Sequence, residues 1–346
     1  MPKTMKVGLI GTGMVSGTYV DAVANAGGRI EVVSVAASRL ASAQAFVAKH
    51  RLSATATDVA DMVRNRSLDF VLLTTPPNAR MDIVHAFAEM GTPILMEKPV
   101  ERTLAAARQL VIACEDVHVP LGIMFQHRAR PSAQAMRDML EKREAGPLHA
   151  AEISVPWWRE QAYYDEPGRG TYARDGGGVL ISQAIHTLDL ALTFTGQPAS
   201  VQAMTATTGF HKMEAEDFVS VGVQFENGAV GSVFASTASY PGRAEEIILH
   251  YANISVRLQS NILEVVDQKT GKTETTGAST ASGAGADPMA FTSDWHRFMI
   301  ENFADHLDNG TPLFAPGRSA LAVHELIAAI ELSGREGQRV TVREVT

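Results

Sequence analysis

The first third of the chain alternates between short apolar runs and longer segments of mixed polarity. Apolar runs typical of buried strands occupy residues 6–10, 30–36, 68–74, 93–96 and 120–125. The segments between them predict helices that end near residue 26 and that span 81–90 and 103–115. Strands that alternate with helices indicate a parallel sheet, whose ligands bind at the carboxyl ends of the strands. This pattern predicts an α/β domain with a doubly wound parallel sheet over residues 1–125.

The remainder of the chain reads as successive strands joined by short turns. Candidate strands occupy residues 148–156, 201–207, 217–225, 229–235, 245–250, 254–258 and 262–266. Such a series of hairpins predicts an antiparallel sheet. Amphipathic patterns at 290–308 and 318–333 predict helices, and the polar Gly-, Ser- and Thr-rich stretch 267–288 predicts a mobile loop. The second domain, residues 126–346, is therefore expected to be α+β.

Composition excludes several classes of protein. The 346 residues suffice for two domains, and the 45% hydrophobic share with 20% charged residues is typical of a globular protein. The formal net charge of -8, without a basic cluster, argues against a nucleic-acid partner. The single cysteine, Cys114, lies in an apolar run and is expected to be buried and inert. No run approaches the ~20 apolar residues of a membrane span, so we expect a cytoplasmic protein. No metal-ligand spacing occurs, so we expect no metal.

A glycine fingerprint follows the first predicted strand. In GTGMVS, Gly11 permits a tight turn, and Gly13 lets the backbone approach a pyrophosphate at the helix N-terminus. The third position is Ser16 instead of glycine, and an ordinary strand–helix turn is the alternative. The second strand ends in Ser38 and Arg39, where an arginine suits a 2′-phosphate, so NADP is favoured over NAD. Arg39 as a solvated residue at a helix start is the alternative.

Three glycines precede an apolar segment in GGGVLISQAIHTLDLAL, residues 176–192. As an α-helix over 179–193, this segment places Ser182, His186 and Asp189 together, opposite a broad apolar face. Asp189 can then reach the imidazole of His186 or be bound elsewhere. A surface helix with a polar face and an incidental histidine is the alternative.

Most of the tryptophan and tyrosine residues gather just upstream, in residues 155–178, interleaved with arginines. Aromatic faces suit a sugar ring and arginine suits a carboxylate, so this segment is a candidate substrate wall. A loop packed on its neighbours is the alternative. Arg128, in the FQHR stretch, is a further candidate.

Four motifs, GTGMVS, TTPPN, EKP and GGGVLISQAIHTLDL, in that order and spacing, resemble the glucose-fructose oxidoreductase, inositol dehydrogenase and MocA (Gfo/Idh/MocA) family over essentially the whole chain. The resemblance implies a Rossmann domain, an α+β domain with an open, mostly antiparallel sheet, a pyridine nucleotide, and a sugar, polyol or related cyclic substrate. It also implies a last helix, 318–333, that packs back on the Rossmann domain. A second subunit often covers the open sheet, so a homodimer or homotetramer is expected.

The resemblance assigns roles residue by residue. Lys98 of EKP contacts substrate and cofactor and assists proton transfer, and its bond to Pro99 is often cis. His186 matches the acid/base candidate at the substrate hydroxyl. Ser182 departs from the pattern, because many polyol dehydrogenases of the family carry aspartate there; a serine cannot act as a carboxylate base. This puts an inositol-dehydrogenase-like relay in doubt.

The expected site therefore has three parts. Lys98 and His186 are the catalytic candidates. The cofactor-binding candidates are Gly11, Thr12, Gly13, Met14, Val15, Ser38, Arg39, Thr75, Pro76, Pro77, Asn78, Glu97 and Lys98. The substrate-binding candidates are Lys98, Arg128, Trp158, Arg159, Tyr164, Arg169, Ser182, Gln183 and His186.

The expected activity is an NAD(P)-dependent transfer of hydride between the nicotinamide and a secondary hydroxyl or keto group. Hydride transfer belongs to the cofactor, and a histidine and a lysine supply the proton route. Two alternatives remain open. One is a redox-assisted glycosidase that holds NAD tightly, and the other is a non-catalytic nucleotide-binding regulator.

Overall fold

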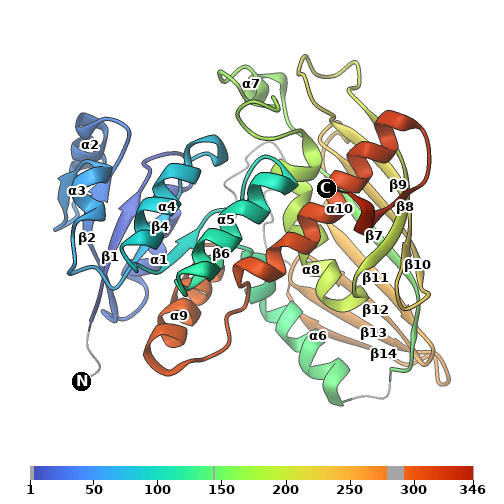
Figure 1. Cartoon of the computed structure of the whole chain (residues 1–346). Coiled ribbons are helices and arrows are strands. Elements are labelled where there is room, and N and C mark those ends of the chain that lie inside the picture. The colour runs from blue at the N-terminus through green and yellow to red at the C-terminus, as the bar shows by residue number, and fades with distance from the viewer. Residues whose placement is uncertain (1–3, 143–144, 279–291, 346) are drawn as a thin grey trace. The chain divides into compact units, whose positions relative to one another are not determined.

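The computed structural model describes residues 4–142, 145–278 and 292–345, and the chain divides into two compact units (Figure 1). The first unit comprises residues up to Glu101, Ala105–Gln126 and Thr292–Ala320. The second comprises Arg102–Leu104, His127–Phe291 and Leu321–Thr346. Each unit has its own sheet.

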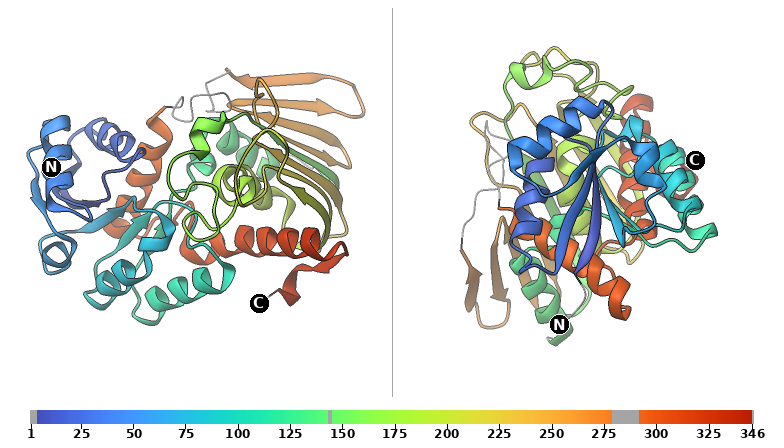
Figure 2. Two further views of the ribbon diagram at one scale, coloured as in Figure 1. Left: turned by 90° about the horizontal axis from the view of Figure 1, so that it is seen from above. Right: turned by 90° about the vertical axis from the view of Figure 1, so that its left-hand side faces the viewer.

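The first unit contains a six-stranded parallel sheet within the described residues, with the order β3-β2-β1-β4-β5-β6. The strands are β1 (Met5–Ile10), β2 (Ile30–Ala36), β3 (Thr55–Thr57), β4 (Phe70–Leu73), β5 (Ile94–Met96) and β6 (Leu121–Ile123). This is the strand order of a doubly wound dinucleotide-binding sheet, so the predicted fold class of this part of the chain is confirmed. Figure 2 shows the twist of these strands in its right-hand view.

The helices of the first unit include one that the sequence interpretation placed elsewhere. They are α1 (Ser16–Ala24), α2 (Leu40–His50), α3 (Val59–Val63), α4 (Met81–Glu89), α5 (Leu104–Asp116) and α9 (Asp294–Asn309), with a 3-10 turn η1 (Pro77–Ala79). Helix α9 was expected in the second domain, but it belongs to the first unit. Its apolar face packs on the first unit's core, where the Phe303 and Phe70 rings lie 5.2 Å apart. At its other side, Asp305 pairs with Arg29 at 2.6 Å.

The second unit contains a nine-stranded sheet among the described residues, with the order β14-β13-β12-β11-β7-β10-β9-β8-β15. The strands are β7 (Leu148–Pro156), β8 (Pro198–Ala206), β9 (Phe218–Phe225), β10 (Val230–Ser236), β11 (Glu246–Tyr251), β12 (Ile254–Gln259), β13 (Ile262–Asp267), β14 (Thr273–Gly277) and β15 (Val340–Thr341). Neighbours pair antiparallel except β7 and β10, which run parallel. The expected mostly antiparallel sheet is therefore confirmed.

Helices cover one face of this sheet. The helical segments are η2 (Gln126–Ala129), α6 (Pro131–Lys142), α7 (Gln161–Tyr164), a π-helical turn η3 (Leu180–Ala184), α8 (Ile185–Thr195), α10 (Gly317–Glu336) and η4 (Val342–Glu344). Helix α8 packs on β7 and β11, and α6 packs on β13 and β14 (Figure 1). Along β9, Val219, Val221 and Val223 are buried while the residues between them are exposed. The described part of the chain thus leaves the other face of the sheet open, as an amphipathic strand pattern predicts.

Helix α10 divides between the units. Its first turn belongs to the first unit, where Arg318 Nε donates to Glu115 Oε1 at 3.0 Å. Residues from Leu321 onward group with the second unit. The packing of the rest of α10 on the first unit stays a prediction.

Two details of the predicted local structure require correction or comment. The predicted loop 267–288 is wrong for its first part, because β14 pairs with β13 there; residues 279–288 lie outside the described part of the chain. Every residue of β14 is exposed, so no hydrophobic alternation marks it in the sequence.

Cys114 is buried as expected, and burial raises the pKa of its thiol to about 12. None of the described helices is both long and apolar enough to cross a bilayer.

Candidate active site

The glycine turn joins β1 to α1 in the first unit. Gly11 has φ +104°, and a Cβ there would lie 2.6 Å from the hydroxyl of Thr74, so only glycine fits this turn. Around Gly13, no described atom lies within 4 Å of the position of an added Cβ, which leaves the backbone open to a ligand. The Ser16 hydroxyl is buried, 2.9 Å from Thr74 Oγ1. The serine that replaces the third glycine therefore ties the start of α1 to the end of β4.

A groove of about 560 Å³ adjoins this turn. Its lining includes Thr12, Gly13 and Met14 from the turn, and Ser42, Lys49 and His50 from α2. The sequence interpretation considered a helix start at Arg39 but did not single out Lys49 and His50 at the other end of α2, although Lys, Arg and His in a helix's last turn are a usual signal. Val15 lies directly before α1, at the position of its N-cap. Exposed glycine backbone at a helix start beside a groove fits a dinucleotide.

Two further features of the first unit bear on the cofactor. The Thr75 hydroxyl is hidden from solvent and has no hydrogen-bond partner among the described residues, so it can serve a ligand. Its neighbours Pro76 and Asn78 are exposed, while Pro77 is buried at the start of η1. Ser38 and Arg39 are both exposed at the carboxyl end of β2. Glu31, in contrast, lies near the opposite end of that strand.

Lys98 is held mainly through its backbone. The guanidinium of Arg80 is fully buried and donates to four carbonyl oxygens, those of Thr75, Glu97, Lys98 and Pro99. The Nε–Thr75 bond is 2.9 Å and the Nη2–Lys98 bond 3.3 Å. Burial lowers the pKa of Arg80 to about 10, with the charge of Glu97 acting in the opposite direction. This single side chain fixes the TTPPN and EKP segments together.

The Glu97 carboxylate extends the same cluster. Tyr19 Oη donates to Glu97 Oε1 at 2.9 Å, and His296 Nε2 lies 3.8 Å from that oxygen. Burial alone would raise the pKa of Glu97, but His296, Lys98 and Arg80 together bring it below the ordinary value. The Lys98–Pro99 peptide is cis, as the resemblance implied. Glu97 thus directly precedes Lys98 in the chain, and its carboxylate lies beside Tyr19 and His296.

His186 lies in the first turn of α8, directly after the π-helical turn. The expected continuous α-helix over 179–193 is therefore wrong, because residues 180–184 form the wider π turn, a feature frequent at functional sites. The surface-helix alternative is also wrong: Gln183, His186 and Asp189 are only 4%, 7% and 1% exposed. Both faces of this segment are buried.

Asp189 does not pair with the histidine one turn before it. Arg128 donates to both of its oxygens, from Nε at 2.7 Å and Nη2 at 2.6 Å. Burial raises the pKa of Asp189, and the charge of Arg128 opposes that effect. The candidate substrate residue Arg128 is therefore engaged in a buried ion pair that anchors η2 to α8.

The partner of the His186 ring is a residue that the sequence interpretation missed. The ring of His127, in η2, lies 4.9 Å from that of His186 between centroids, with the planes 30° apart. His127 is only 4% exposed. In the FQHR stretch the sequence singles out only Arg128 as a candidate. The position of His127 in the sequence does not indicate a contact with the ring of His186, which lies much later in the chain.

The glycine run before the π turn is shaped by Glu216. A Cβ on Gly178 would collide with the carbonyl oxygen of Glu216, whose carboxylate accepts from the Gly178 and Leu180 amides at 3.2 and 3.1 Å. Glu331 lies beside Gly177, and its Oε1 has no hydrogen-bond partner in the described part of the chain. Burial first, and then the charge of Glu216, raise the pKa of Glu331 to about 8.

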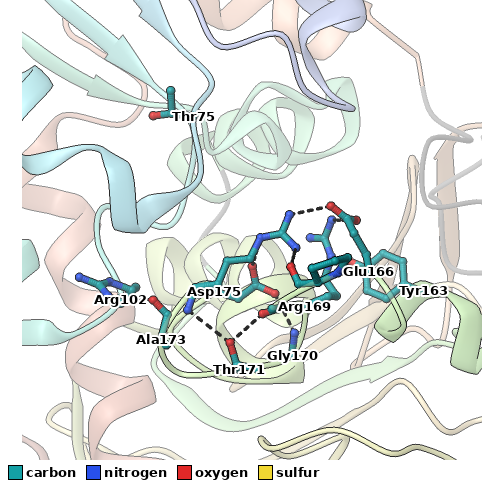
Figure 3. A network of polar contacts seen from close by, with 12 residues as sticks. Thr75, Arg102, Tyr163, Glu166, Arg169, Gly170, Thr171, Ala173 and Asp175 are labelled. Atoms are coloured by element: carbon teal, nitrogen blue, oxygen red, sulfur yellow. Dashed lines mark hydrogen bonds and ion pairs between the residues drawn. The ribbon is translucent and has the colours of Figure 1, made fainter. Parts of the chain in front are cut away.

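An ordered loop precedes these glycines (Figure 3). Arg169 and Arg174 both pair with Glu166, at 2.8 and 2.7 Å, and Asp175 accepts from the Gly170 amide at 2.8 Å. The Arg169 guanidinium also lies 4.8 Å from the ring centre of Tyr163. Arg169, a substrate candidate, therefore has structural partners within the loop.

The remaining wall candidates form a buried aromatic group. The Arg159 guanidinium is stacked over the ring of Trp157 at 5.2 Å and that of Tyr163 at 5.7 Å. The Tyr164 hydroxyl lies 2.7 Å from Thr237 Oγ1. Trp158 is half-buried, with its ring edge-on to Phe210 and Tyr240 at 5.6 and 5.3 Å. These residues pack on their neighbours, and Trp158 is the most accessible of the three substrate candidates here, which are Trp158, Arg159 and Tyr164.

The side-chain amide of Gln183 is only partly hydrogen-bonded within the described residues. Its Nε2 donates to Tyr163 Oη at 3.2 Å, whereas its buried Oε1 has no partner among the residues described. Ser182, its neighbour, is half-buried and donates its amide to Gly178 at 3.1 Å. A buried amide oxygen without a donor fits a ligand that brings a hydroxyl. Among the described residues, no group of three His, Cys, Asp or Glu side chains could hold a metal ion.

The chain belongs to the Gfo/Idh/MocA family of oxidoreductases. Residues 5–125 match the family's NAD-binding Rossmann-fold model, and residues 133–257 match its C-terminal domain model. D-apiose dehydrogenase of Paraburkholderia graminis is 26% identical over 99% of this chain and 91% of the relative. Inositol 2-dehydrogenase of Rhizobium meliloti is 23% identical over 98% and 99%.

Solved structures agree with this assignment. The WlbA dehydrogenase of Bordetella pertussis, in complex with NADH and UDP-GlcNAcA, is 25% identical and has a TM-score of 0.82 over 98% of this chain and 99% of that one. A levoglucosan dehydrogenase in complex with NADH and levoglucosan shares the fold, with a TM-score of 0.87 at 19% identity over 99% and 100%. The first unit is thus the NAD-binding Rossmann domain of an oxidoreductase.

Proposed function

We propose that this oxidoreductase transfers hydride between a nicotinamide cofactor and a secondary hydroxyl or keto group of a sugar, polyol or related cyclic compound. The observation that carries the proposal is the unpartnered amide oxygen of Gln183, buried one turn before His186 within the described residues. A substrate hydroxyl would satisfy it. The names of the relatives, an apiose and an inositol dehydrogenase among them, support a polyhydroxylated substrate.

The protein's own residues handle the proton. The cofactor, when bound, supplies or accepts the hydride. His186 takes the hydroxyl proton as general base in the oxidation and returns it in the reduction. Lys98 donates to the substrate oxygen and stabilises the charge that develops there. Gly11, Gly13 and the start of α1 hold the pyrophosphate, and the Thr75 hydroxyl is available to the nicotinamide half.

We further propose that the cofactor is NADP. Ser38 and Arg39 lie exposed at the carboxyl end of β2, where the adenosine ribose binds in this fold. An arginine there supports a 2′-phosphate, because its planar donors match phosphate oxygens. The open face of the second sheet supports a homodimer or homotetramer. We also propose a cytoplasmic location.

Fluorescence titration with NADPH and NADH tests the cofactor proposal. The Arg39→Ala variant is expected to bind NADPH at least about tenfold more weakly while its NADH affinity changes less than about threefold, because only the phosphate contact is lost. Arg64→Ala, which removes the same charge from the exposed side chain of an α3-flanking residue, is the matched control. An equal loss for both nucleotides would contradict the NADP assignment. A loss only in Lys49→Ala would move the phosphate contact to the groove beside α2.

A screen of sugars and polyols with the preferred nucleotide tests the reaction. Formation or consumption of NAD(P)H, followed by its absorbance, is the expected result. Glycoside cleavage by protein that carries non-exchanging NAD, without net reduced cofactor, would replace the proposal with a redox-assisted glycosidase. Tight nucleotide binding with no turnover, unchanged in Lys98→Ala, would replace it with a regulator.

A further inference from the structure

His127 lies against the candidate base through a ring-on-ring contact. The two imidazole centroids are 4.9 Å apart and their planes differ by 30°. Both residues belong to the second unit and both are buried, at 4% and 7% exposure. A ring in this tilted contact restricts the orientation of its neighbour's plane without competing for the neighbour's nitrogens.

Arg130 fixes the protonation of His127. Arg130 Nη2 lies 2.6 Å from His127 Nε2. Because a guanidinium only donates, Nε2 must accept, and the proton of His127 therefore resides on Nδ1. The ring beside His186 is thus a neutral imidazole in one tautomer.

The charge of Arg130 is balanced deeper in the protein. Arg130 Nη1 donates to Glu245 Oε1 at 2.6 Å, and Trp157 Nε1 donates to Glu245 Oε2 at 3.3 Å. Arg130 and Glu245 are each 2% exposed. Four separate segments, the ends of β7 and η2 and the starts of α6 and β11, converge on this chain of contacts. A second charged group nearby, the Arg128–Asp189 pair, is likewise internally balanced.

We infer that His127 is a positioning residue for His186: the series Trp157–Glu245–Arg130–His127 holds a neutral ring against the imidazole of His186 and sets its orientation toward the substrate. The inference rests on the proposed function of His186 as the proton acceptor. A neutral partner also adds no like charge when His186 takes up a proton. The stacked ring is therefore expected to matter for turnover and little for substrate binding.

Two substitutions separate the ring from its hydrogen bond. His127→Gln keeps an acceptor near the position of Nε2 for Arg130 but removes the ring; His127→Phe keeps a ring but leaves the Arg130 donor unmatched. A loosened base lowers kcat, so His127→Gln is expected to lose about tenfold or more in kcat with KM within about twofold. His127→Phe is expected to retain kcat within about threefold, although its melting temperature falls because a buried donor is unpaired. His250→Asn, at a half-exposed histidine on the sheet, is the control and keeps wild-type kinetics.

Wild-type kcat in His127→Gln would overturn the inference. So would losses in the two variants that simply follow their melting temperatures, because a purely structural role predicts a larger defect in the Phe variant. An increase in KM with unchanged kcat would equally overturn it, by making His127 a binding residue.

Side-chain NMR of protein labelled with nitrogen-15 at its histidines provides a readout that needs no substrate. His127 is expected to show a proton on Nδ1 and a bare Nε2 at neutral pH, and His186 signals are expected to shift in His127→Gln but not in His250→Asn. The signals are assigned from their loss in His127→Gln and His186→Asn. A proton on Nε2 of His127, or unmoved His186 signals, would overturn the inference even if no sugar is turned over. Absence of turnover with intact signals would instead count against the proposed function alone.

Discussion

The two candidate reactive side chains are held in opposite ways. In the first unit, Arg80 bonds to the backbone on both sides of Lys98, so the path of the chain itself is fixed. In the second unit, His186 is flanked by side chains, with the His127 ring on one side and the Arg128–Asp189 pair one turn further along α8. The backbone of Lys98 is thus held by Arg80, and the ring of His186 lies against a neighbouring ring.

This difference has a physical consequence. Arg80 serves four carbonyl groups, so its removal takes the donor from all four at once and acts on stability. The His127 ring accepts one hydrogen bond from Arg130, so its removal costs less stability and acts mainly on the orientation of His186. Loss of the Arg80 side chain is therefore expected to appear as unfolding, and loss of the His127 ring as slower turnover.

The largest expected effect is on turnover when the reactive groups themselves are removed. Lys98→Met and His186→Asn are each expected to reduce kcat/KM by about 10²- to 10⁴-fold, because Lys98 is proposed to stabilise the charge on the substrate oxygen and His186 is proposed to take its proton. Thermal melting checks that both variants are folded, and absorbance of NAD(P)H measures the rates. Unchanged rates in either variant would remove that residue from the comparison.

The next effect concerns the backbone clamp. Arg80→Met is expected to destabilise the protein by about 3–5 kcal/mol, because it takes the donor from four carbonyl groups and removes one of the positive charges near the Glu97 carboxylate. Arg80→Lys is not expected to restore stability, since one ammonium cannot reach four carbonyl oxygens in a fork. Chemical denaturation measures the difference, with Arg64→Met as the surface control. A loss below about 1 kcal/mol would show that the clamp is dispensable.

The smallest effect belongs to a buried carboxyl in the second unit, that of Glu331. Its pKa is raised from 4.5 to about 8, so the stability that its protonated form provides is present at low pH and is lost as the pH rises through that range. Glu331→Gln removes this dependence and is expected to raise the melting temperature by about a few degrees at a pH near 8 and by less at a pH near 5. A gain that is equal at both pH values would contradict a protonated Glu331.

The sequence predicted those parts of the molecule in which local pattern and burial agree. Strand β2 matches its predicted range, 30–36, because it is a largely apolar run in a sheet covered on both faces. Strand β14 was missed because its side chains are all solvent-exposed, which gives no alternation to detect. The π turn was missed because an apolar run looks the same whether its backbone hydrogen bonds span four positions or five.

The candidate site shows the same division. The order and spacing of the motifs are enough to single out Gly11, Lys98 and His186. The neighbours of His186 could not be found in that way, because they are chosen by tertiary packing. Asp189 is one turn away from His186, yet it binds Arg128, 61 positions earlier in the chain. Periodicity identifies which residues share a helix face, but not which other segment meets that face.

The packing of α9 on the first unit has a consequence for how the protein is made. Arg29, which directly precedes β2, donates a hydrogen bond to Asp308, 279 positions later in the sequence. When the ribosome has completed the six strands of the Rossmann sheet, it has not yet synthesised α9. The surface around Tyr19 and Phe70, which α9 covers, therefore stays exposed while most of the second sheet is synthesised. The amino-terminal unit is thus expected to finish folding late, with apolar surface exposed to chaperones until the chain is nearly complete.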